Sequence, residues 1–262
     1  MTTGRAGPHV RERLSSQQPA PAGTRDLPDL LGQTILLIAE GSAIGREIEE
    51  RARAAGAQVL VAAGQAGPPF PAADALPTSA TSAPDPDHLD RILAALPRPI
   101  DHVLVTGAAP YQAPLVDFDI SRAAHDVDEH FWLPIRVARS AVGRVRPGGM
   151  LLFVGGTAAG RRAAGPSLAS ALIAARPALI ASLAREVAPI RVNLIGAGLA
   201  VDRPLSARLL GATLDQHLSD PGATLAVARV VRPADVARLA VHLMCAAVTG
   251  ATYDVDGGGR IR

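Results

Sequence analysis

Short apolar runs alternate with amphipathic stretches along most of the chain. Residues 34–38 form an apolar, β-branched run of strand length, and residues 58–62 form a second one. Between them, residues 46–55 place Ile48 and Ala52 on one face of a helix and charged side chains on the other. A strand, a turn of small residues, a helix and a second strand within about 30 residues predict a βαβ nucleotide-binding unit.

The same alternation continues to the C-terminus. Further strands are predicted at 101–105, 150–154, 190–195 and within 248–258, with a short one near 73–82, and helices at 88–96, 119–141, 163–186 and from 232 onward. Pro177 is expected to kink the helix that contains it. Residues 1–27 show no periodicity, which is typical of a disordered leader. We therefore expect one α/β domain over residues 28–262.

Composition narrows the class of protein. A length of 262 residues suits one large α/β domain, and 48% hydrophobic with only 3% aromatic residues predicts a core of Ala, Val, Leu and Ile. The net charge of +2, with arginines spread along the chain, argues against nucleic-acid binding. Cys245 is the sole cysteine and lies in an apolar helical run, so we expect it to be buried and to form no internal disulfide.

Membrane and secretion signals are not evident in the sequence. No apolar run appears long enough to span a membrane, and the N-terminus lacks the apolar region of a signal peptide. We expect a cytoplasmic, soluble protein with no membrane partner.

One absence restricts the chemistry more than these averages do. All 26 basic residues are arginines, because the chain contains no lysine. Arginine stays protonated at any working pH and cannot replace lysine as a proton-transfer group. Schiff-base chemistry, a P-loop lysine and a Tyr-Lys proton relay are thereby excluded. The abundance of Arg, Ala, Gly and Pro is also consistent with genome base composition.

The last third of the chain carries the most specific motifs. Residues 183–189 read Leu-Ala-Arg-Glu-Val-Ala-Pro, residues 191–193 read Arg-Val-Asn, and residues 249–258 read Thr-Gly-Ala-Thr-Tyr-Asp-Val-Asp-Gly-Gly. With the turn at residues 38–45, they resemble the short-chain dehydrogenase/reductase (SDR) family over residues 28–260. The resemblance implies a Rossmann-like, doubly wound parallel sheet of seven strands, roughly in the order 3-2-1-4-5-6-7. It also implies a homodimer or homotetramer.

The turn that would bind a dinucleotide is degraded. It aligns with the family's Thr-Gly-x-x-x-Gly-x-Gly, but Ala39 and Ala43 replace the first two glycines. Alanine methyls would crowd a pyrophosphate that glycines let the backbone approach, and Glu40 adds a negative charge. The cofactor is therefore left unknown, with NAD(P)(H) possible and no metal expected. If a dinucleotide binds, the resemblance places it on Gly41, Ser42, Ile44, Gly45 and Ala108.

The family's catalytic triplet is missing. After the strand at 150–154, the family places a Ser that orients the carbonyl, a Tyr that acts as acid and base, and a Lys that lowers the pKa of the Tyr. The same register here falls on Gly156, Ala169 and Ile173. Because hydride transfer to a ketone needs a positioned proton donor, the sequence indicates a divergent member that lacks the standard site.

Three other residues are candidates for proton transfer. Tyr111 follows a strand end, where doubly wound sheets bind ligands, although it could equally be a loop tyrosine packed on prolines. His130 aligns with the family's active-site Asn and would exchange a proton near pH 7, unless it only hydrogen-bonds backbone. Thr157 offers a hydroxyl near the crevice.

A substrate pocket is expected around these residues. Arg161 could clamp a carboxylate or phosphate, or be merely solvated. Asp202 and Arg203 either pair with each other or face a ligand, and residues 205–228 resemble the family's mobile substrate lid. The predicted pocket residues are Gly156, Arg161, Ser167, Asp202 and Arg203.

Three functions fit these features. The first is an enzyme of small-molecule metabolism with non-redox chemistry: isomerisation, cyclisation or elimination. The second is an NAD(P)-dependent oxidoreductase with relocated catalytic groups. The third is a catalytically dead binding or regulatory partner of an active relative. We rank the first narrowly above the second, since fold-level resemblance says little about chemistry once the site has changed.

Overall fold

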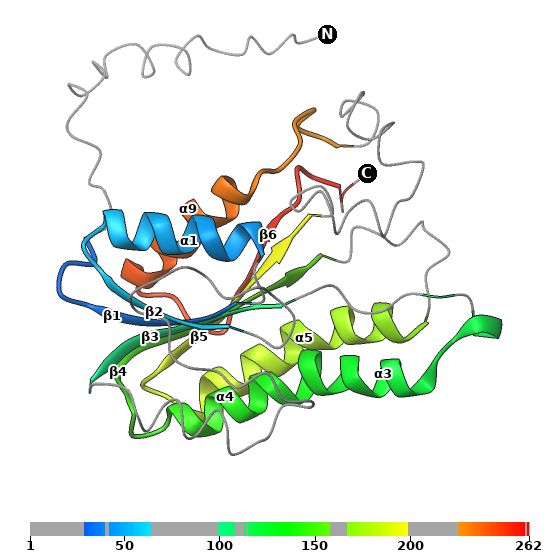
Figure 1. Cartoon of the computed structure of the whole chain (residues 1–262), viewed down its shortest axis with the longest axis horizontal. Helices are drawn as coiled ribbons and strands as arrows, with labels where there is room; N and C mark the ends of the chain where they lie inside the picture. The colour runs from blue at the N-terminus through cyan, green and yellow to red at the C-terminus, as the bar shows by residue number, and fades with distance from the viewer. Residues whose placement is uncertain are drawn as a thin grey trace, which may run out of the picture.

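A parallel sheet with helices on both faces forms the body of the protein (Figure 1), as seen in a computed structural model of the chain. The structure describes residues 29–39, 42–63, 99–107, 113, 115–157, 167–198, 225–259 and 261. Within these residues the sheet has six strands in the order β2-β1-β3-β4-β5-β6. The predicted leader, the short strand near 73–82 and the helix at 88–96 lie outside the described residues, so six of the seven expected strands are accounted for.

The βαβ unit predicted at the N-terminal end is confirmed. It consists of β1 (Thr34–Ala39), α1 (Ala43–Ala54) and β2 (Gln58–Ala63), and the two strands pair in parallel. Gly56 ends the helix with a φ of 90°, a left-handed conformation that side-chain-bearing residues rarely adopt. The chain can thus turn directly from α1 into β2.

The remaining strands extend the sheet in parallel. They are β3 (Ile100–Thr106), β4 (Val145–Gly156), β5 (Arg191–Ala197) and β6 (Thr252–Val255). The helical segments are η1 (Leu115–Asp117), α3 (Ile120–Val127), η2 (Asp128–Trp132), α4 (Leu133–Ala141), α5 (Ser167–Glu186) and α9 (Pro233–Cys245). All pairings are parallel, so the carboxyl ends of the strands meet at one edge of the sheet.

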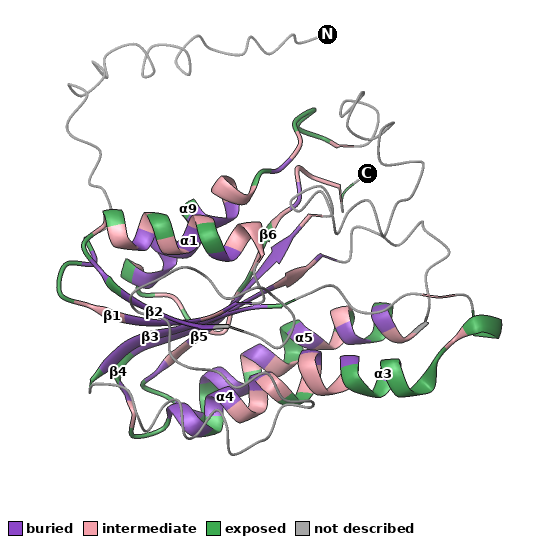
Figure 2. Cartoon of the chain, in the orientation of Figure 1, coloured by how far each residue is buried: buried purple, intermediate pink, exposed green. Residues whose placement is uncertain are grey.

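Two apolar cores lie on opposite faces of this sheet. Helices α1 and α9 cover one face, and α4 and α5 cover the other (Figure 1). The central strands are buried on both sides (Figure 2), and every residue of β3 is buried. Continuous apolar runs are what such doubly covered parallel strands require.

The helix predicted at 119–141 is not a single regular helix. It is split into α3, the π-helical segment η2 and α4. Pro134 lies in the first turn of α4 and has no N–H to donate, and proline within a helix displaces the regular bonding pattern. The π-helical segment carries His130, so the irregularity coincides with a predicted site residue.

Helix α5 corrects one expectation about membrane-spanning segments. By length and composition, Leu168–Glu186 could cross a membrane, with a mean hydropathy of 1.4. The helix packs on β5 as part of the core, and it runs through Pro177 without ending there. Length and composition are weak evidence for a membrane span, because the core helix of a globular protein can be equally long and apolar.

Cys245 is not buried, contrary to the prediction. It is the last residue of α9 and is a free, exposed cysteine. Its Sγ lies 3.7 Å from the Asp29 carbonyl oxygen. The prediction rested on the apolar residues next to Cys245 in sequence, but the buried face of α9 ends at Met244.

Asn193, the only asparagine in the chain, anchors the last strand to the sheet. Its Nδ2 donates to the Val248 carbonyl at 2.9 Å, and its Oδ1 accepts from the Ala251 N–H at 3.2 Å. The side chain is completely buried, so both of its polar atoms are satisfied within the protein. The motif at 191–193 therefore has a structural role here.

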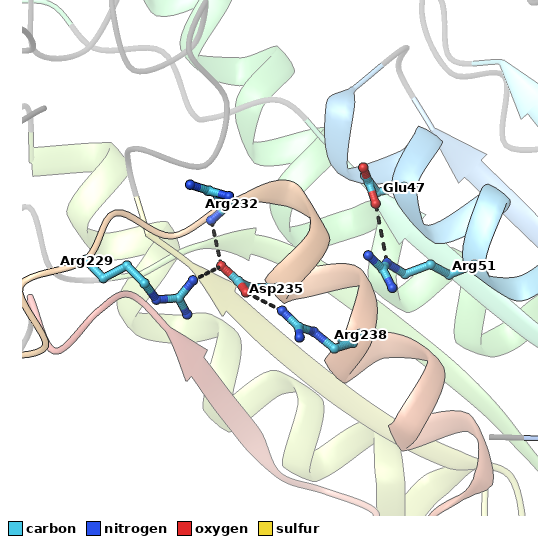
Figure 3. A network of polar contacts seen from close by, with 6 residues as sticks. All are labelled: Glu47, Arg51, Arg229, Arg232, Asp235 and Arg238. Carbon is cyan, nitrogen blue, oxygen red and sulfur yellow. Dashed lines mark hydrogen bonds and ion pairs between the residues drawn. The ribbon is translucent and has the colours of Figure 1, made fainter. Parts of the chain in front are cut away.

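Asp235 organises the N-terminus of α9 (Figure 3). Its carboxylate accepts the Arg232 N–H at 3.0 Å, and it pairs with Arg229 at 3.0 Å and with Arg238 at 2.6 Å. Burial alone would raise the pKa of Asp235, but the hydrogen bond from Arg232 and the contacts of Arg229 and Arg238 hold that pKa below its ordinary value. The carboxylate thus stabilises the first turn of the helix.

We expect the Asp235→Asn variant to lower the free energy of unfolding by about 1–2 kcal/mol at pH 7, since it loses charge-assisted hydrogen bonds to arginines that are themselves exposed. A carboxylate with a lowered pKa stabilises the fold above its ordinary pKa of about 4, and that stability is lost as the pH falls. Urea unfolding at pH 7 and pH 3 should show the gap between the two proteins shrinking. A gap that is constant with pH would contradict this role.

Candidate active site

The first strand-to-helix turn is tied together by hydroxyl groups. Ser42 precedes α1, and its Oγ accepts the Gly45 N–H at 3.0 Å and lies 3.2 Å from the Thr106 Oγ1. A Cβ on Gly45 would stand 2.9 Å from the Ala39 Cβ, so this glycine is required for close packing. The Ser42 hydroxyl therefore accepts a hydrogen bond from one of the N–H groups at the start of α1, which a phosphate would otherwise use.

The other predicted cofactor residues divide into two groups. Ile44 is partly buried against the core on the α1 side, and Ala39 belongs to that same core. Gly41 and Ala108 lie outside the described residues. The retained features are thus a capped helix N-terminus at the carboxyl edge of β1 and a single glycine, which is less than the family's full turn provides.

Small and apolar residues stand where the family resemblance predicts the catalytic triplet. Gly156 ends β4, and a Cβ on it would meet the Ile173 Cδ1 of α5 at 4.0 Å. Ala169 is buried on the same helix. The fold thus brings Gly156 and Ile173 together as the family register implies, without a group on either that can transfer a proton.

Arg176 introduces a positive charge at this place. A Cβ on Gly155 would overlap its guanidinium, with the Cζ at 2.5 Å and the Nη2 at 2.8 Å. Long helical side chains lean toward the N-terminus of their helix, which carries the guanidinium from α5 back over the end of β4. The absence of a side chain at Gly155 therefore creates the space that the guanidinium fills.

The Arg176 guanidinium is buried and poorly satisfied. Its closest polar contact is a 3.5 Å approach of Nη2 to the Val154 carbonyl oxygen, and its Nε has no hydrogen-bond partner. No acidic side chain among the described residues pairs with it. Burial lowers the pKa of Arg176 to about 10, so the group is still charged at pH 7.

His130 is the second buried polar group of the site. It is 4% exposed, and its Nε2 has no hydrogen-bond partner. Burial, then the charges of Arg176 and His125, lower the pKa of His130 to about 3. The imidazole is therefore neutral at pH 7.

Thr157 and Asp254 meet at the neighbouring glycine of β5. A Cβ on Gly196 would stand 2.5 Å from the Asp254 Oδ1 and 3.0 Å from the Thr157 Cγ2. The Thr157 N–H donates to the Ala197 carbonyl at 3.1 Å, which fixes the chain just after β4. Thr157 is thus held at the carboxyl edge of the sheet, beside β5.

The structure tests only part of the predicted site. It places Gly156 at the end of β4 and Thr157 directly after it. His130 lies on η2, which packs against α5. Ser167 begins α5, but its side chain lies outside the described residues, as do Tyr111, Arg161, Asp202 and Arg203. In the described part of the chain, no group of three His, Cys, Asp or Glu side chains is arranged to hold a metal ion.

Sequence reasoning missed Arg176. It is the one charged residue between Ser167 and Ala184, within an otherwise apolar helix, and it directly precedes Pro177. A lone charge on a helix that must pack against a sheet is a signal for a buried functional group. That signal was available without the structure.

A cavity lies away from these residues, at the opposite ends of the strands. It has a volume of about 390 Å³ and is lined by residues 142–147 and 186–190, at the amino ends of β4 and β5. Doubly wound sheets bind ligands at the carboxyl ends of their strands. The residues around Gly155 therefore form the candidate active site.

The fold defines a doubly wound α/β protein whose strands meet with their carboxyl ends at one edge of the sheet. The family model described as enoyl-(acyl carrier protein) reductase matches residues 38–259. The chain belongs to the short-chain dehydrogenase/reductase family. The parallel sheet, its strand order and the flanking helices agree with this family, as the sequence predicted.

Individual relatives support the same family. The short-chain dehydrogenase/reductase ATR9 of Stachybotrys chlorohalonatus is 27% identical over 259 residues, covering 88% of this chain and 98% of the relative. The structure of the MalC reductase/Diels-Alderase from Malbranchea aurantiaca has a TM-score of 0.74 at 25% identity and covers 89% and 98% of the two chains. A short-chain dehydrogenase from Burkholderia cenocepacia in complex with NADP has a TM-score of 0.72 at 21% identity and covers 88% and 98%.

We expect Gly155→Ala to destabilise the protein by about 1–3 kcal/mol, because the new methyl group must displace the buried guanidinium of Arg176. Gly156→Ala is the matched control, and its methyl group finds space beside Ile173. Urea unfolding of both variants measures the difference. Equal effects of the two substitutions would show that Arg176 does not occupy the space over Gly155.

Buried histidines should make stability depend on pH. Burial and nearby arginines also lower the pKa of His102 to about 3. A histidine with a lowered pKa binds protons only when unfolded, between about pH 6.5 and 3. Each such group therefore removes about 1.4 kcal/mol of stability per pH unit as the pH falls through that window.

We expect His130→Gln to reduce the pH dependence of unfolding between pH 6.5 and 5 by about half, since His102 remains. Urea unfolding midpoints at several pH values provide the measurement. The prediction is wrong if the wild type and the variant lose stability with the same slope.

Proposed function

We propose that this protein is an enzyme that rearranges a small molecule without net oxidation or reduction, by isomerisation, cyclisation or elimination. The observation that carries the proposal is the replacement of the family's proton-transfer groups by Gly156, Ala169 and Ile173, next to a buried cation. Hydride transfer to a carbonyl needs a proton donor at this place. Redox-neutral rearrangement can use charge stabilisation and orientation instead.

The residues present suit that kind of chemistry. The Arg176 guanidinium is fixed in a water-poor environment, where it can stabilise negative charge that develops on a substrate oxygen. The neutral imidazole of His130 can accept or donate one hydrogen bond through Nε2. The Thr157 hydroxyl can orient a polar group of the substrate. Together they bind and polarise a substrate without acting as a strong acid.

One of the similar proteins makes redox-neutral chemistry plausible on this scaffold. The MalC structure is named both a reductase and a Diels-Alderase, and the second activity is a cyclisation. Related folds host several chemistries through changes at one site. The similarity supports the class of reaction proposed here and says nothing about the substrate of this chain.

NAD(P)-dependent oxidoreduction is the second candidate function. The N-terminus of α1 still lies at the carboxyl end of β1, with Ser42 and Gly45 in place, and this is where a dinucleotide phosphate would bind. A similar Burkholderia dehydrogenase is described in complex with NADP. In this case a residue outside the triplet register, such as Tyr111, would supply the proton.

We expect the purified protein to convert a compound from a small-molecule extract into a product of equal mass, or of a mass lowered by an eliminated group, when no nicotinamide cofactor is present. Mass spectrometry of the extract before and after incubation measures this. His130→Gln should slow the conversion at least tenfold. Arg185→Met, on the exposed side of α5, is the matched control and should leave it unchanged.

The same experiment is repeated with NADH and NADPH. Products that gain two hydrogens and form only with a reduced cofactor would overturn the proposal in favour of oxidoreduction. An intact protein that converts nothing and co-purifies with an active relative would favour a binding partner. The homodimer or homotetramer implied by the family resemblance remains a prediction of this proposal.

A further inference from the structure

The buried polar atoms around Gly155 are an unusual set. The Nε of Arg176 and the Nε2 of His130 are both buried without a hydrogen-bond partner. Most buried polar groups in proteins are paired, so each exception needs an explanation. Arg51 Nε, His102 Nδ1 and Arg144 Nε are also buried without a hydrogen-bond partner, and what distinguishes Arg176 and His130 is that their elements, α5 and η2, pack against each other.

The charge at Arg176 makes the explanation more specific. A buried cation without a partner costs several kcal/mol, because it has lost its hydration without gaining a counter-charge. Among the residues that the structure describes, the guanidinium meets the Val154 carbonyl oxygen alone, at the outer limit of hydrogen bonding. Its remaining N–H groups form a planar fork, the geometry that matches a carboxylate. An oxyanion is the kind of group that would complete these hydrogen bonds.

The surroundings suit an anion with a single negative charge. Arg176 supplies one positive charge and His130 is neutral, so a monoanion matches the charge of the Arg176 guanidinium. A doubly charged phosphate would leave a net negative charge inside the protein. His130 Nε2 can add one hydrogen bond when its ring carries the proton on that nitrogen.

The local backbone is also unusual at this place. His130 lies in the π-helical segment η2, a type of segment that occurs frequently at functional sites. Gly155 provides the space in which the guanidinium rests at the carboxyl edge of β4. The sheet, the irregular helix and α5 thus converge on one point.

We propose that Arg176 and His130 form a subsite that binds a carboxylate group of the substrate at the end of β4. This inference rests on the proposed function for the statement that the carboxylate belongs to a substrate. Carboxylate binding itself requires no turnover. Arg161, the predicted clamp, lies outside the described residues.

Binding is tested by thermal unfolding of the full-length protein in acetate or propionate, with chloride at equal ionic strength as the reference. A ligand at ten times its dissociation constant should raise the unfolding midpoint by about 3–6 °C. The fluorescence of Trp132, the only tryptophan and two residues from His130, gives a second readout.

Three variants locate the effect. Arg176→Met should abolish the carboxylate shift, and without ligand it should unfold no earlier than the wild type, because it removes an unpaired buried charge. Arg185→Met lies on the exposed side of the same helix and should keep the shift. His130→Gln should weaken the shift without abolishing it.

Several results would overturn the subsite. These are no shift in the wild type, an equal shift in Arg176→Met, or a larger shift with phosphate than with acetate. Loss of folding in Arg176→Met would also overturn the subsite, because it would show that the guanidinium already has a structural partner. An Arg176→Lys variant that folds normally but does not respond to carboxylates would leave that conclusion unchanged. A carboxylate shift combined with strictly NAD(P)H-dependent turnover would instead remove the proposed function and leave the subsite standing.

Discussion

Parallel pairing of the central strands is the constraint on which the rest of this structure depends. Because β1, β3, β4 and β5 run in the same direction, their carboxyl ends meet at one edge, and each needs a crossover that covers a face of the sheet. Ser42, Gly155 and Gly196 all lie at that edge or beside it. The site is thus assembled from segments that are far apart in sequence by one feature of the fold.

The absence of side chains at two neighbouring positions shapes this edge. Gly155 and Gly196 are paired across β4 and β5, and other side chains fill the space above each of them. Arg176 enters over Gly155, while Asp254 and Thr157 lie over Gly196. A guanidinium therefore lies on one side of this pair of glycines, and a carboxylate and a threonine lie on the other.

The buried guanidinium of Arg176 has a cost in stability. A buried guanidinium that no acidic side chain of the described residues pairs with weakens the fold, whereas an apolar residue of similar size would strengthen it. Active sites commonly retain such unfavourable groups because a ligand or transition state compensates them. The rest of the protein offsets the cost through two separate apolar cores and buried polar anchors such as Asn193.

The sequence by itself determined the architecture, because apolar periodicity, Gly56 and the motifs at 183–193 and 249–258 are local features that specify strands, helices and their order. It also predicted that Gly156, Ala169 and Ile173 stand at the family's Ser, Tyr and Lys positions. Only the tertiary structure decided that Arg176 takes up the space over Gly155, that His130 is neutral, and that Cys245 is exposed. The physical reason is that burial, pKa and the direction of a long side chain depend on neighbours from distant segments, and periodicity along the chain does not record those neighbours.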